Sequence, residues 1–581
     1  MSELEHTETP ETNFDVIVVG TGLSESILAG ALTRTGKTVL HIDENEFYGD
    51  HGATFDNKGL LRFFLGVGAE DDTTAKAEIQ SNYHDVTVNV YADKIDEIVD
   101  EGTPKVELNA ENPTASDEAS GIETEPTRNP SEAWHSRTLS TIQSFLSSQS
   151  DAHLYLQALL STPVDPATLT SESDFKTLLK VSTACKILRD SRKYNLEIAP
   201  KLLFCRGPIV ELLVSSGVGR YLEFKALESI YMRWEAGFEK VPGSKEDVFA
   251  NQTVTLLEKR RLMKFMNMAA GTEEEPSEVL KEHEDKPFAD FLSSQNLSPR
   301  LSAVIMNAIS FVLDAEAAGK LTTKEGVELT RRHMQSLGRW GKTAFLVALY
   351  GAGSELTQAF CRLCAVYGGV YMLNYKLDSF SVQERATERP VKVKGADGSE
   401  YSADWLITSG TYAGLVKKGF SNAAFKSTSC WRAILIVDKS IHADANLTLT
   451  IFPPQSSGRG VVVWQQNSDT AACPSPYYVV YCCVQDGDKS DLEAAIATFA
   501  QVASDGAKTN TKANILLSVF YREEVLEPTE RWVAPRVAVC GIKPSSLDFE
   551  ESVEVAKGVF DKIVEDGEFL PTVPDPEDLA A

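Results

Sequence analysis

Residues 14–43, FDVIVVGTGLSESILAGALTRTGKTVLHID, contain the most informative pattern of apolar and polar positions in the chain. The unbroken apolar run at residues 14–19 predicts a buried strand, and residues 38–42 predict a second strand. Between them, Gly20-Thr21-Gly22 predicts a tight turn into a helix. This order is typical of a dinucleotide-binding βαβ unit, in which Asp43 occupies the position of the acid that binds a cofactor ribose.

One residue of this motif opposes a bound cofactor. The third glycine of the G-x-G-x-x-G pattern is replaced by Glu25, which falls in the first turn of the predicted helix. A cofactor pyrophosphate would meet the helix dipole and the free N–H groups there, and a carboxylate at that point repels it strongly if desolvated. We therefore predict a flavoprotein-like scaffold that binds no cofactor, with Gly20, Gly22 and Asp43 as remnants of the site.

Helices and strands are predicted in separate parts of the remaining chain. Apolar residues at helical spacing predict helices over residues 139–160, 254–270 and 301–315. From residue 362 to residue 540 strands predominate, and the clearest are residues 433–437, 461–464, 477–483 and 515–521. The predicted fold class is α/β. It combines an FAD-binding-like domain with a mixed sheet, residues 1–241 and 342–581, and a smaller all-helical domain, residues 242–341.

A long insertion interrupts the first domain at about residues 66–190. Within it, residues 69–73 and 100–130 are rich in Glu, Asp, Thr, Pro and Ser and almost free of aromatic residues, which predicts exposed loop or disorder. The helical spacing at residues 139–160 indicates that the insertion, although mostly polar, is not all linker. The chain ends in an acidic tail.

Composition narrows the class of protein and of partner. The net charge of −28 argues against nucleic acid and against anionic membrane surfaces and favours basic partners, although much of this acidity serves only solubility. No stretch approaches the roughly 20 apolar residues that span a bilayer. The acidic start, MSELEHTETPETN, is not a secretory signal. The nine scattered cysteines suit a reducing cytosol, so we expect a cytosolic protein.

No catalytic or metal-binding constellation is recognisable. The nine histidines form no HExxH or HxH pattern, and there is no G-x-S-x-G motif or phosphate-binding loop. His41 is interpreted as a core histidine. Cys361-x-x-Cys364 has no second pair and is interpreted as two buried small residues, with metal or redox chemistry as the less favoured alternative. The residues alone therefore leave the chemistry open.

Several segments together resemble the family that contains the Rab escort proteins and the Rab GDP dissociation inhibitors. They keep the family's order over most of the chain: GTGLSESILAG at residues 20–30, HIDENEFYG at 41–49, LEKRRLMKF at 257–265, LGRWGKTAFLVALYG at 337–351 and SELTQAFCRLCAVYGGVYMLN at 354–374. The escort branch fits better, through RGPIVELL at 206–213, VPGSKEDVF at 241–249, FCRLCAVYGG at 360–369 and FLPTVPDPEDL at 569–579. The insertion and the acidic tail also fit that branch.

The resemblance implies a flavin-monooxygenase-type fold without FAD and a non-enzymatic accessory subunit. Its members bind Rab GTPases in the GDP state. The escort branch presents them to the Rab geranylgeranyltransferase heterodimer, holds the doubly geranylgeranylated product and delivers it through a transient membrane contact. The first alternative is a Rab GDP dissociation inhibitor. The second is an FAD-dependent oxidoreductase of the amine-oxidase type, which Glu25 disfavours.

The resemblance also implies a Rab-binding platform at Tyr48, Glu355, Arg362 and Val370, where Val370 replaces the usual threonine. Arg362 and Glu355 are seven residues apart, so a helix would place them on one face, and a simple surface ion pair between them is the alternative. A loop that engages Rab and membrane would carry Arg339 and Phe345, with Trp340 in place of a tyrosine. Two departures are Asp50 for the second glycine of a pair and an extra residue between Gly353 and Glu355.

The helical module would carry the lipid and transferase sites that the resemblance implies. An isoprenoid groove is predicted at Met263, Met266, Ile305 and Ile309, because methionine adapts to irregular apolar ligands, and core packing is the alternative for any one of them. The transferase contact is predicted at three further residues of the module, which are Phe288, Phe291 and Arg300. Phe288 and Phe291 are three residues apart and would share a helix face, although at least one of them is a candidate for the core.

Overall fold

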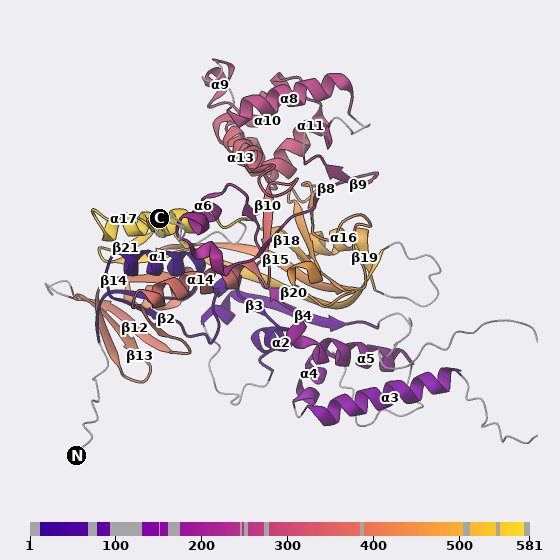
Figure 1. The fold of residues 1–581 in the computed structure, drawn as a ribbon, viewed down its shortest axis with the longest axis horizontal. Coiled ribbons are helices and arrows are strands. Elements are labelled where there is room, and N and C mark those ends of the chain that lie inside the picture. Colours follow the sequence, from indigo (N-terminus) through magenta and orange to yellow (C-terminus); the bar gives the residue numbers. More distant parts are fainter. Residues whose placement is uncertain are drawn as a thin grey trace, which may run out of the picture.

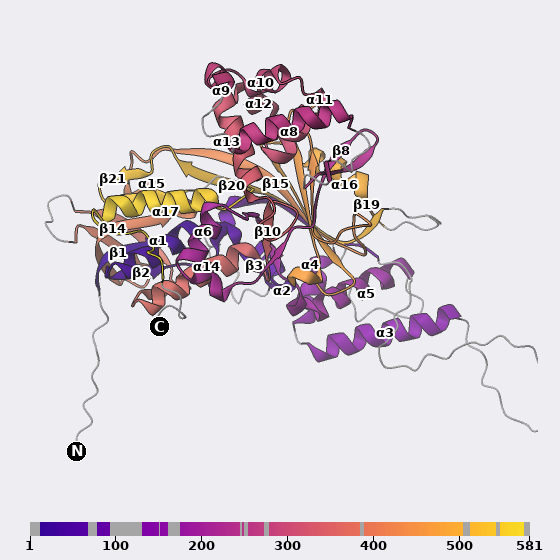
Figure 2. The same cartoon turned by 45° about the horizontal axis from the view of Figure 1, so that its top comes forward.

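An α/β body and a helical module that rises from one side of it make up the molecule (Figure 1). The computed structural model describes residues 12–67, 78–92, 130–149, 151–160, 175–243, 247–248, 254–271, 278–383, 389–502, 512–541 and 547–573. The loop predictions for residues 69–73 and 100–129 lie outside the described residues. Turning the molecule leaves the module at the same end of the body (Figure 2).

The first sheet of the body contains the predicted βαβ unit. Its strand order is β11-β2-β1-β14-β13-β12, with β22 also paired to β14 and β21 to β22. Strand β1 (Asn13–Val19) lies parallel between β2 (Val39–Ile42) and β14 (Glu400–Ser409), and helix α1 (Leu23–Arg34) connects β1 to β2. The remaining strands are β11 (Val370–Met372), β12 (Leu377–Val382), β13 (Val391–Gly395), β21 (Trp532–Ala534) and β22 (Val537–Cys540). The predicted α/β class and βαβ unit are confirmed.

Three helices cover one face of this sheet. Helix α1 packs against α14 (Ala352–Val366) and against α17 (Glu550–Ile563), and the three share one apolar core with α6 (Pro208–Ser215) (Figure 1). Helix α15 (Ala413–Gly419) follows β14 and contacts β12. The N-terminus of α1 and the start of α14 therefore meet at the carboxyl ends of β1 and β2, where ligands bind in open α/β sheets.

The second sheet of the body has nine strands in the order β19-β20-β15-β18-β17-β16-β8-β9, with β4 on β20. It contains all four strands predicted from residue 433 onward, each longer than predicted: β15 (Phe425–Val437), β17 (Val461–Gln466), β18 (Tyr478–Gln485) and β20 (Ala513–Pro528). Its other strands are β4 (Tyr83–Val90), β8 (Ser229–Trp234), β9 (Gly237–Val241), β16 (Thr448–Phe452) and β19 (Ala500–Gln501). Helix α16 (Lys489–Phe499) packs on its outer face.

The insertion contributes more ordered structure than predicted. Strand β4 pairs antiparallel with β20 and so belongs to the second sheet, which no prediction anticipated. The predicted helix over residues 139–160 is instead two helices, α3 (Pro130–Ser148) and α4 (Ala152–Leu159). They pack with α2 (Asn57–Leu65) and α5 (Phe175–Arg189) beside the main core.

Between β9 and β10 (Phe345–Ala348), the described residues form helices. These are α8 (Leu256–Ala270), α9 (Glu278–His283), α10 (Phe288–Ser294), α11 (Pro299–Ala303), a π-helix (Val304–Ile309), α12 (Ala315–Lys320) and α13 (Thr323–Ser336). The helix predicted over residues 301–315 is wrong beyond Ile309. The chain leaves the helix at Ser310, and Phe311 has a φ of 53°. A non-glycine residue in that region cannot continue a right-handed helix.

Short sheets connect the parts. Strand β10 pairs with β6 (Leu203–Phe204) and β7 (Phe224–Ala226), and β3 (Thr54–Phe55) pairs with β5 (Leu196–Glu197).

All nine cysteines are free thiols, and Cys482 and Cys483 lie inside β18, in the region where the sequence predicted a strand. Within the described ranges, no helix combines the length and the apolar character needed to cross a bilayer.

Candidate functional site

Glu25 occupies the first turn of α1, as predicted. Its side chain is only 2% exposed, and its Oε1 atom has no hydrogen-bond partner. Burial raises the pKa of this carboxyl well above its usual value, and the nearby Asp50 raises it further. A neutral, buried carboxyl therefore stands where a pyrophosphate would need free N–H groups.

Asp43 is also unable to serve as a ribose acceptor. Its carboxylate accepts hydrogen bonds from the backbone N and the Oγ1 of Thr21, both at 2.7 Å. It also accepts from the backbone N and the Nδ2 of Asn45, both at 2.8 Å, and from the Tyr412 hydroxyl at 3.1 Å. Two carboxylate oxygens offer about four lone-pair sites, so the chain itself uses the whole capacity of this acid.

His41 is a core residue, as interpreted from the sequence. Its ring is fully buried, its Nε2 lies 2.7 Å from the carbonyl oxygen of Gly20, and burial lowers its pKa to about 4. A neutral imidazole that holds the turn after β1 is a structural group and not a general base exposed to a substrate.

A cavity of about 50 Å³ remains where the cofactor would lie, lined by Gly22, Gly49, Gly353 and Glu25 among others. A space of that size holds a few water molecules. This cavity does not fit a flavin dinucleotide, because it is too small, Glu25 is neutral, and the hydrogen-bonding capacity of Asp43 is already used by the chain itself. The residues present at this site therefore argue against cofactor binding, whereas the fold around them is that of a cofactor-binding unit.

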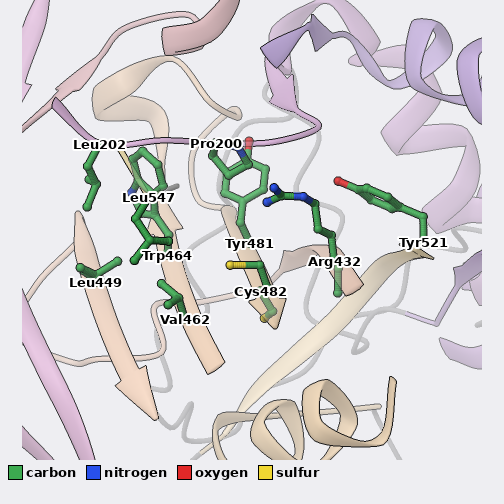
Figure 3. A pocket seen from close by; sticks show the side chains of 12 residues that line it. Pro200, Leu202, Arg432, Leu449, Val462, Trp464, Tyr481, Cys482, Tyr521 and Leu547 are labelled. Carbon is green, nitrogen blue, oxygen red and sulfur yellow. The ribbon is translucent and has the colours of Figure 1, made fainter. Parts of the chain in front are cut away.

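A buried cluster of charged groups closes this cavity on the side of the second sheet. Arg432 on β15 donates from Nε to Glu523 on β20 at 2.6 Å, and His51 Nδ1 lies 3.0 Å from the other oxygen of that carboxylate. Although burial raises the pKa of Glu523, Arg432 and His51 together hold it at about 2. Figure 3 shows Arg432 reaching into a neighbouring pocket with Tyr481 on one side and Tyr521 on the other.

Of the four residues predicted for a Rab-binding platform, the structure brings Tyr48 and Glu355 together, because the loop that carries Tyr48 contacts the start of α14. Tyr48 follows β2, half-buried, and its ring meets Tyr371 edge-on at 6.5 Å. Val370 precedes Tyr371 and is exposed at the start of β11. Glu355 lies in the first turn of α14, half-buried, and burial raises its pKa. We call the surface formed by Tyr48, Glu355, Arg362 and Val370 the platform.

Arg362 lies further along α14, seven residues or about 10 Å from Glu355. It is exposed, and its guanidinium carbon lies 4.4 Å from the centre of the Tyr221 ring. In the part of the chain that the structure describes, no ion pair joins Arg362 to Glu355, so the simple ion-pair alternative is wrong. An arginine stacked on a tyrosine keeps its N–H donors directed outward, available to a partner.

The platform loop is fixed by direct contact with the start of α14. The Ser354 hydroxyl donates to the Tyr48 carbonyl at 3.1 Å and accepts from the Thr54 N–H at 2.9 Å. A Cβ atom on Gly353 would lie 2.2 Å from the Gly52 carbonyl oxygen, so the two backbones leave no room for a side chain. Ser354, the extra residue between Gly353 and Glu355, thus joins the loop to the helix.

The second departure from the family pattern is accommodated in the same loop. Asp50, at the position usually held by glycine, has a φ of 50°, and its Oδ1 accepts from the Thr411 hydroxyl at 2.6 Å. Aspartate tolerates left-handed backbone better than most residues, and this hydrogen bond holds it there. The substitution therefore keeps the turn.

Sequence inspection missed part of the apolar surface around the platform. The exposed large apolar residues that it missed on or beside α14 are Tyr221, Tyr350, Val366 and Tyr367. Val366, which is 70% exposed, and Tyr367 fall within the segment at residues 360–369 that resembles the escort proteins, so the sequence did contain a signal for them. Tyr221 carried none, because it reaches α14 only through the tertiary fold. Grouped exposed apolar residues of this kind are typical of protein interaction sites.

The loop before β10 is only partly as predicted. Arg339 donates to the Cys205 carbonyl at 2.7 Å, pairs with Glu211 on α6 and stacks on the exposed Trp340 ring at 4.1 Å. The prediction that Phe345 lies in this loop is wrong. Phe345 begins β10, where it is buried against Phe204 in the core, because the strand continues the apolar run of residues 344–348.

The aromatic residues predicted to face the transferase are both buried. Phe288 and Phe291 share one face of α10, as predicted, but each is 0% exposed and packs with Phe265 of α8. The prediction of an exposed contact at these two residues is therefore wrong, and the physical reason is that they form the core of a small module. Arg300 is partly exposed; it pairs with Glu239 and lies 5.0 Å over the Trp234 ring.

The residues predicted for an isoprenoid groove divide between core and cavity. Ile305 is fully buried in the module core, so the alternative of core packing is correct for this residue. Met266 and Ile309 line an apolar cavity of about 70 Å³ between the module and strands β8 and β9. Met263 is half-buried and lies outside this lining.

No metal site is apparent where the structure can be described, since no three potential ligands come together there. Cys361 and Cys364 are buried on α14, and burial raises the pKa of the Cys361 thiol to about 12 and that of Cys364 as well. Protonated, buried thiols are inert, which supports their interpretation as small core residues.

Comparison with known sequences identifies relatives of the chain. The sequence pattern of the family described as GDP dissociation inhibitor matches residues 10–85 and 143–481. A second pattern, described as RAE1/2 domain I, C-terminal region, matches residues 430–542. The chain is 29% identical over 622 residues to the Rab proteins geranylgeranyltransferase component A 2 of Mus musculus, an alignment that covers 98% of each chain.

Solved structures share the fold. The Rab GDI of Plasmodium falciparum superposes with a TM-score of 0.62 at 17% identity, covering 96% of this chain and 99% of that one. An oxidoreductase from Methanosarcina mazei superposes with a TM-score of 0.51 at 11% identity, covering 94% and 100%. At these identities the likeness to both proteins is one of fold alone.

Proposed function

This chain belongs to the GDP dissociation inhibitor family, and from that premise we propose that it acts as a Rab escort protein. In this role it binds GDP-bound Rab GTPases, presents them to Rab geranylgeranyltransferase and carries the geranylgeranylated product to membranes. The observation that carries the proposal is the alignment over 98% of both chains with a geranylgeranyltransferase component A. The chain is then an accessory subunit whose chemistry resides in the partner enzyme.

The platform supplies the contacts that such a role requires. Arg362 on Tyr221, with Tyr48 and Glu355 nearby, offers charged and hydroxyl groups that recognise polar groups of a folded GTPase without any proton transfer. The exposed Val366, Tyr367 and Val370 supply apolar area beside them. Tyrosine and arginine are enriched in interface hot spots, and apolar area beside them is typical of the buried core of an interface.

The oxidoreductase alternative is not supported by the site. Glu25 is buried and neutral, Asp43 is engaged by three neighbouring residues, and the cavity holds only a few waters. A flavin has no place there, so we infer that the scaffold serves to position the platform and performs no redox chemistry.

For the lipid, we infer that the cavity lined by Met266 and Ile309 opens to accept an isoprenoid. Its volume of about 70 Å³ is smaller than a twenty-carbon chain, so the module has to widen when it binds. Each buried CH₂ contributes about 0.8 kcal/mol, so even partial insertion stabilises the complex by several kcal/mol. Methionine in the lining reduces the cost of the rearrangement.

Arg362→Ala is expected to weaken binding of an unprenylated, GDP-bound Rab by roughly 10- to 150-fold, because a charged hydrogen bond lost at an interface costs about 1.5–3 kcal/mol. Isothermal titration or fluorescence anisotropy measures the change. The matched control is Arg536→Ala, which removes another arginine stacked on an aromatic ring, Trp405, on β14. Normal Rab binding by both Arg362→Ala and Tyr48→Ala would show that the platform has been misplaced.

The chain alone is expected to transfer no lipid, whereas the transferase is expected to require it. A reaction that contains Rab, transferase and geranylgeranyl diphosphate, with and without the chain, measures this through incorporation of labelled lipid. The physical reason is effective concentration, since binding the folded GTPase brings its C-terminal cysteines to the active site. If the chain binds prenylated Rab but does not stimulate transfer, the dissociation-inhibitor role replaces the escort role.

A further inference from the structure

The outer face of α8 carries two exposed leucines at its start. Leu256 is 74% and Leu257 is 58% exposed, the first of these being the most exposed large apolar side chain of the described residues. Arg260 and Lys264 follow at helical spacing on the same face and are exposed as well. We call Leu256, Leu257, Arg260 and Lys264 the α8 face.

The α8 face is part of a well-anchored helix. On the opposite side of α8, Leu262, Phe265 and Ala269 are buried in the module core. Thr255 and Glu258 form a capping box at the N-terminus, so the acidic side chain of Glu258 is turned back onto the cap. The fold therefore holds the two leucines in contact with water. A partner that covers them would gain free energy by removing this apolar surface from water.

The charge of α8 is opposite to that of the chain as a whole. The chain carries 84 acidic and 56 basic residues, whereas α8 has four basic residues and one acidic residue, Glu258. Arg261, between the two charged members of the face, donates to the Asn296 carbonyl at 3.0 Å and adds to the same positive region. A strongly acidic protein approaches a negative surface only through such a locally basic region.

We propose that the α8 face docks on an anionic phospholipid surface, with Leu256 and Leu257 entering the interface and Arg260 and Lys264 meeting the lipid headgroups. Apolar residues beside basic ones on an interfacial helix are the pattern that binds such surfaces. The net charge of −28 excludes non-specific attraction to the same surface, so the contact has to be local and oriented.

The position of the α8 face gives this contact a purpose. Leu262 and Met266, on the inner side of α8, line the cavity of about 70 Å³ together with Val254, which precedes the leucines. Docking through the outer face of α8 would leave that cavity one helix diameter, roughly 10 Å, from the bilayer surface. The purpose, transfer of a bound isoprenoid into the bilayer, rests on the proposed escort function, but the docking itself requires neither Rab nor lipid cargo.

Flotation of the full chain with vesicles tests the proposal. The chain is expected to float with vesicles in which phosphatidylserine replaces about a third of the phosphatidylcholine, to stay behind with pure phosphatidylcholine, and to detach as salt is added. Arg260→Glu/Lys264→Glu is expected to weaken binding roughly 30-fold or more, since each basic residue near the surface contributes about 1 kcal/mol. Leu256→Ser/Leu257→Ser is expected to weaken it too.

The matched control is Lys417→Glu/Lys418→Glu, which makes the same change of charge at two exposed lysines of α15 in the body. It is expected to bind vesicles like the wild type. Equal weakening by the control and the α8 variant would mean that only net charge acts, and it would overturn the proposal. Absence of wild-type binding to the anionic vesicles would overturn it as well.

Two further readouts separate this proposal from the proposed function. Affinity for unprenylated Rab is measured for every variant, and it is expected to stay unchanged because the platform lies in the body. Failure of the wild type to bind Rab would contradict the escort role but would not contradict the proposed membrane contact. If the α8 variants float normally but no longer support the transferase, the α8 face is a protein-docking surface and the proposal is overturned.

Discussion

The α/β body and the helical module both have apolar cores, but the body also buries an ion pair. Beneath the platform, the body buries Arg432 and Glu523, which are held together by an ion pair with hydrogen-bond geometry. The core of the module is built from aromatic and aliphatic side chains, among them Phe265, Phe288 and Phe291. Directional contacts fix one geometry, whereas apolar contacts tolerate repacking.

This difference suits the two tasks proposed for them. A surface that recognises a folded GTPase needs residues held in one arrangement, and the platform loop is held by Ser354, by the contact of Gly52 with Gly353 and by the buried cluster below it. A module that accepts a flexible lipid needs a core that can open. Its cavity of about 70 Å³ is lined mostly by apolar side chains, and also by Glu239, Lys240 and Arg300. The predictions below act on each region separately.

The largest expected effect is on the module. The double variant Phe288→Ala/Phe291→Ala removes two fully buried rings, and each such truncation costs about 3–5 kcal/mol, so the pair approaches the entire stability of a typical domain. Hydrogen exchange is expected to show loss of protection in α8, α10 and α13, with the body protected and Rab still bound. Leu256→Ala, at an exposed position, is the control. Unchanged protection in the module would contradict the burial of these rings.

In the body, Arg432→Leu is expected to lower the free energy of unfolding by about 3–5 kcal/mol, because it leaves the buried Glu523 carboxylate without its cation. Chemical denaturation measures the loss. The control is Arg522→Leu on the same strand as Glu523, whose pair with Asp85 is partly exposed and is expected to contribute under about 1 kcal/mol. Comparable losses of unfolding free energy in the two variants would mean that burial does not increase the contribution of the Arg432–Glu523 pair to stability.

The smallest effect is a dependence on pH at Glu25. Its folded pKa is raised well above 4.5 by burial, so the folded state keeps a proton that the unfolded chain releases. The resulting stability is complete below pH 4.5 and is lost as pH rises through the folded pKa. Glu25→Gln removes this loss. Its unfolding free energy relative to wild type is therefore expected to rise with pH, by at most about 1.4 kcal/mol per pH unit. Parallel denaturation profiles would contradict a neutral Glu25.

The sequence was sufficient for the features that local chemistry determines. The βαβ unit followed from an apolar run and two glycines, and Glu25 stands in the first turn of α1 because the spacing of the motif places it there. Tyr48 and Glu355 could be predicted because each lies within a segment that resembles the family, at residues 41–49 and 354–374. Strand β4 was missed although Val86, Val88 and Val90 alternate with polar residues, because the acidic composition of the insertion obscured a short period-two pattern.

Burial of single side chains was beyond what the sequence could specify. Phe288 and Phe291 share a helix face, but which face points inward is decided by α8 and α13, with Gly326 leaving room for the Phe288 ring. Likewise, the stacking of Arg362 on Tyr221 joins positions 141 residues apart through the tertiary fold. The end of the π-helix at Ser310 has no local signal, since the apolar spacing continues through Val312 and Leu313.

The hydrogen bonds at Asp43 also constrain how this chain can change over evolutionary time. Thr21, Asn45 and Tyr412 use its carboxylate to hold the ends of β1 and β2 and the turn after β14. Freeing Asp43 to bind a ribose would remove these hydrogen bonds. Replacing Glu25 with glycine would allow a pyrophosphate to bind only if the cavity also became wider. No single step gains a cofactor, and freeing Asp43 also lowers stability, so intermediates would be selected against. A descendant of this chain would therefore acquire a cofactor more readily at a new site than at the end of β1.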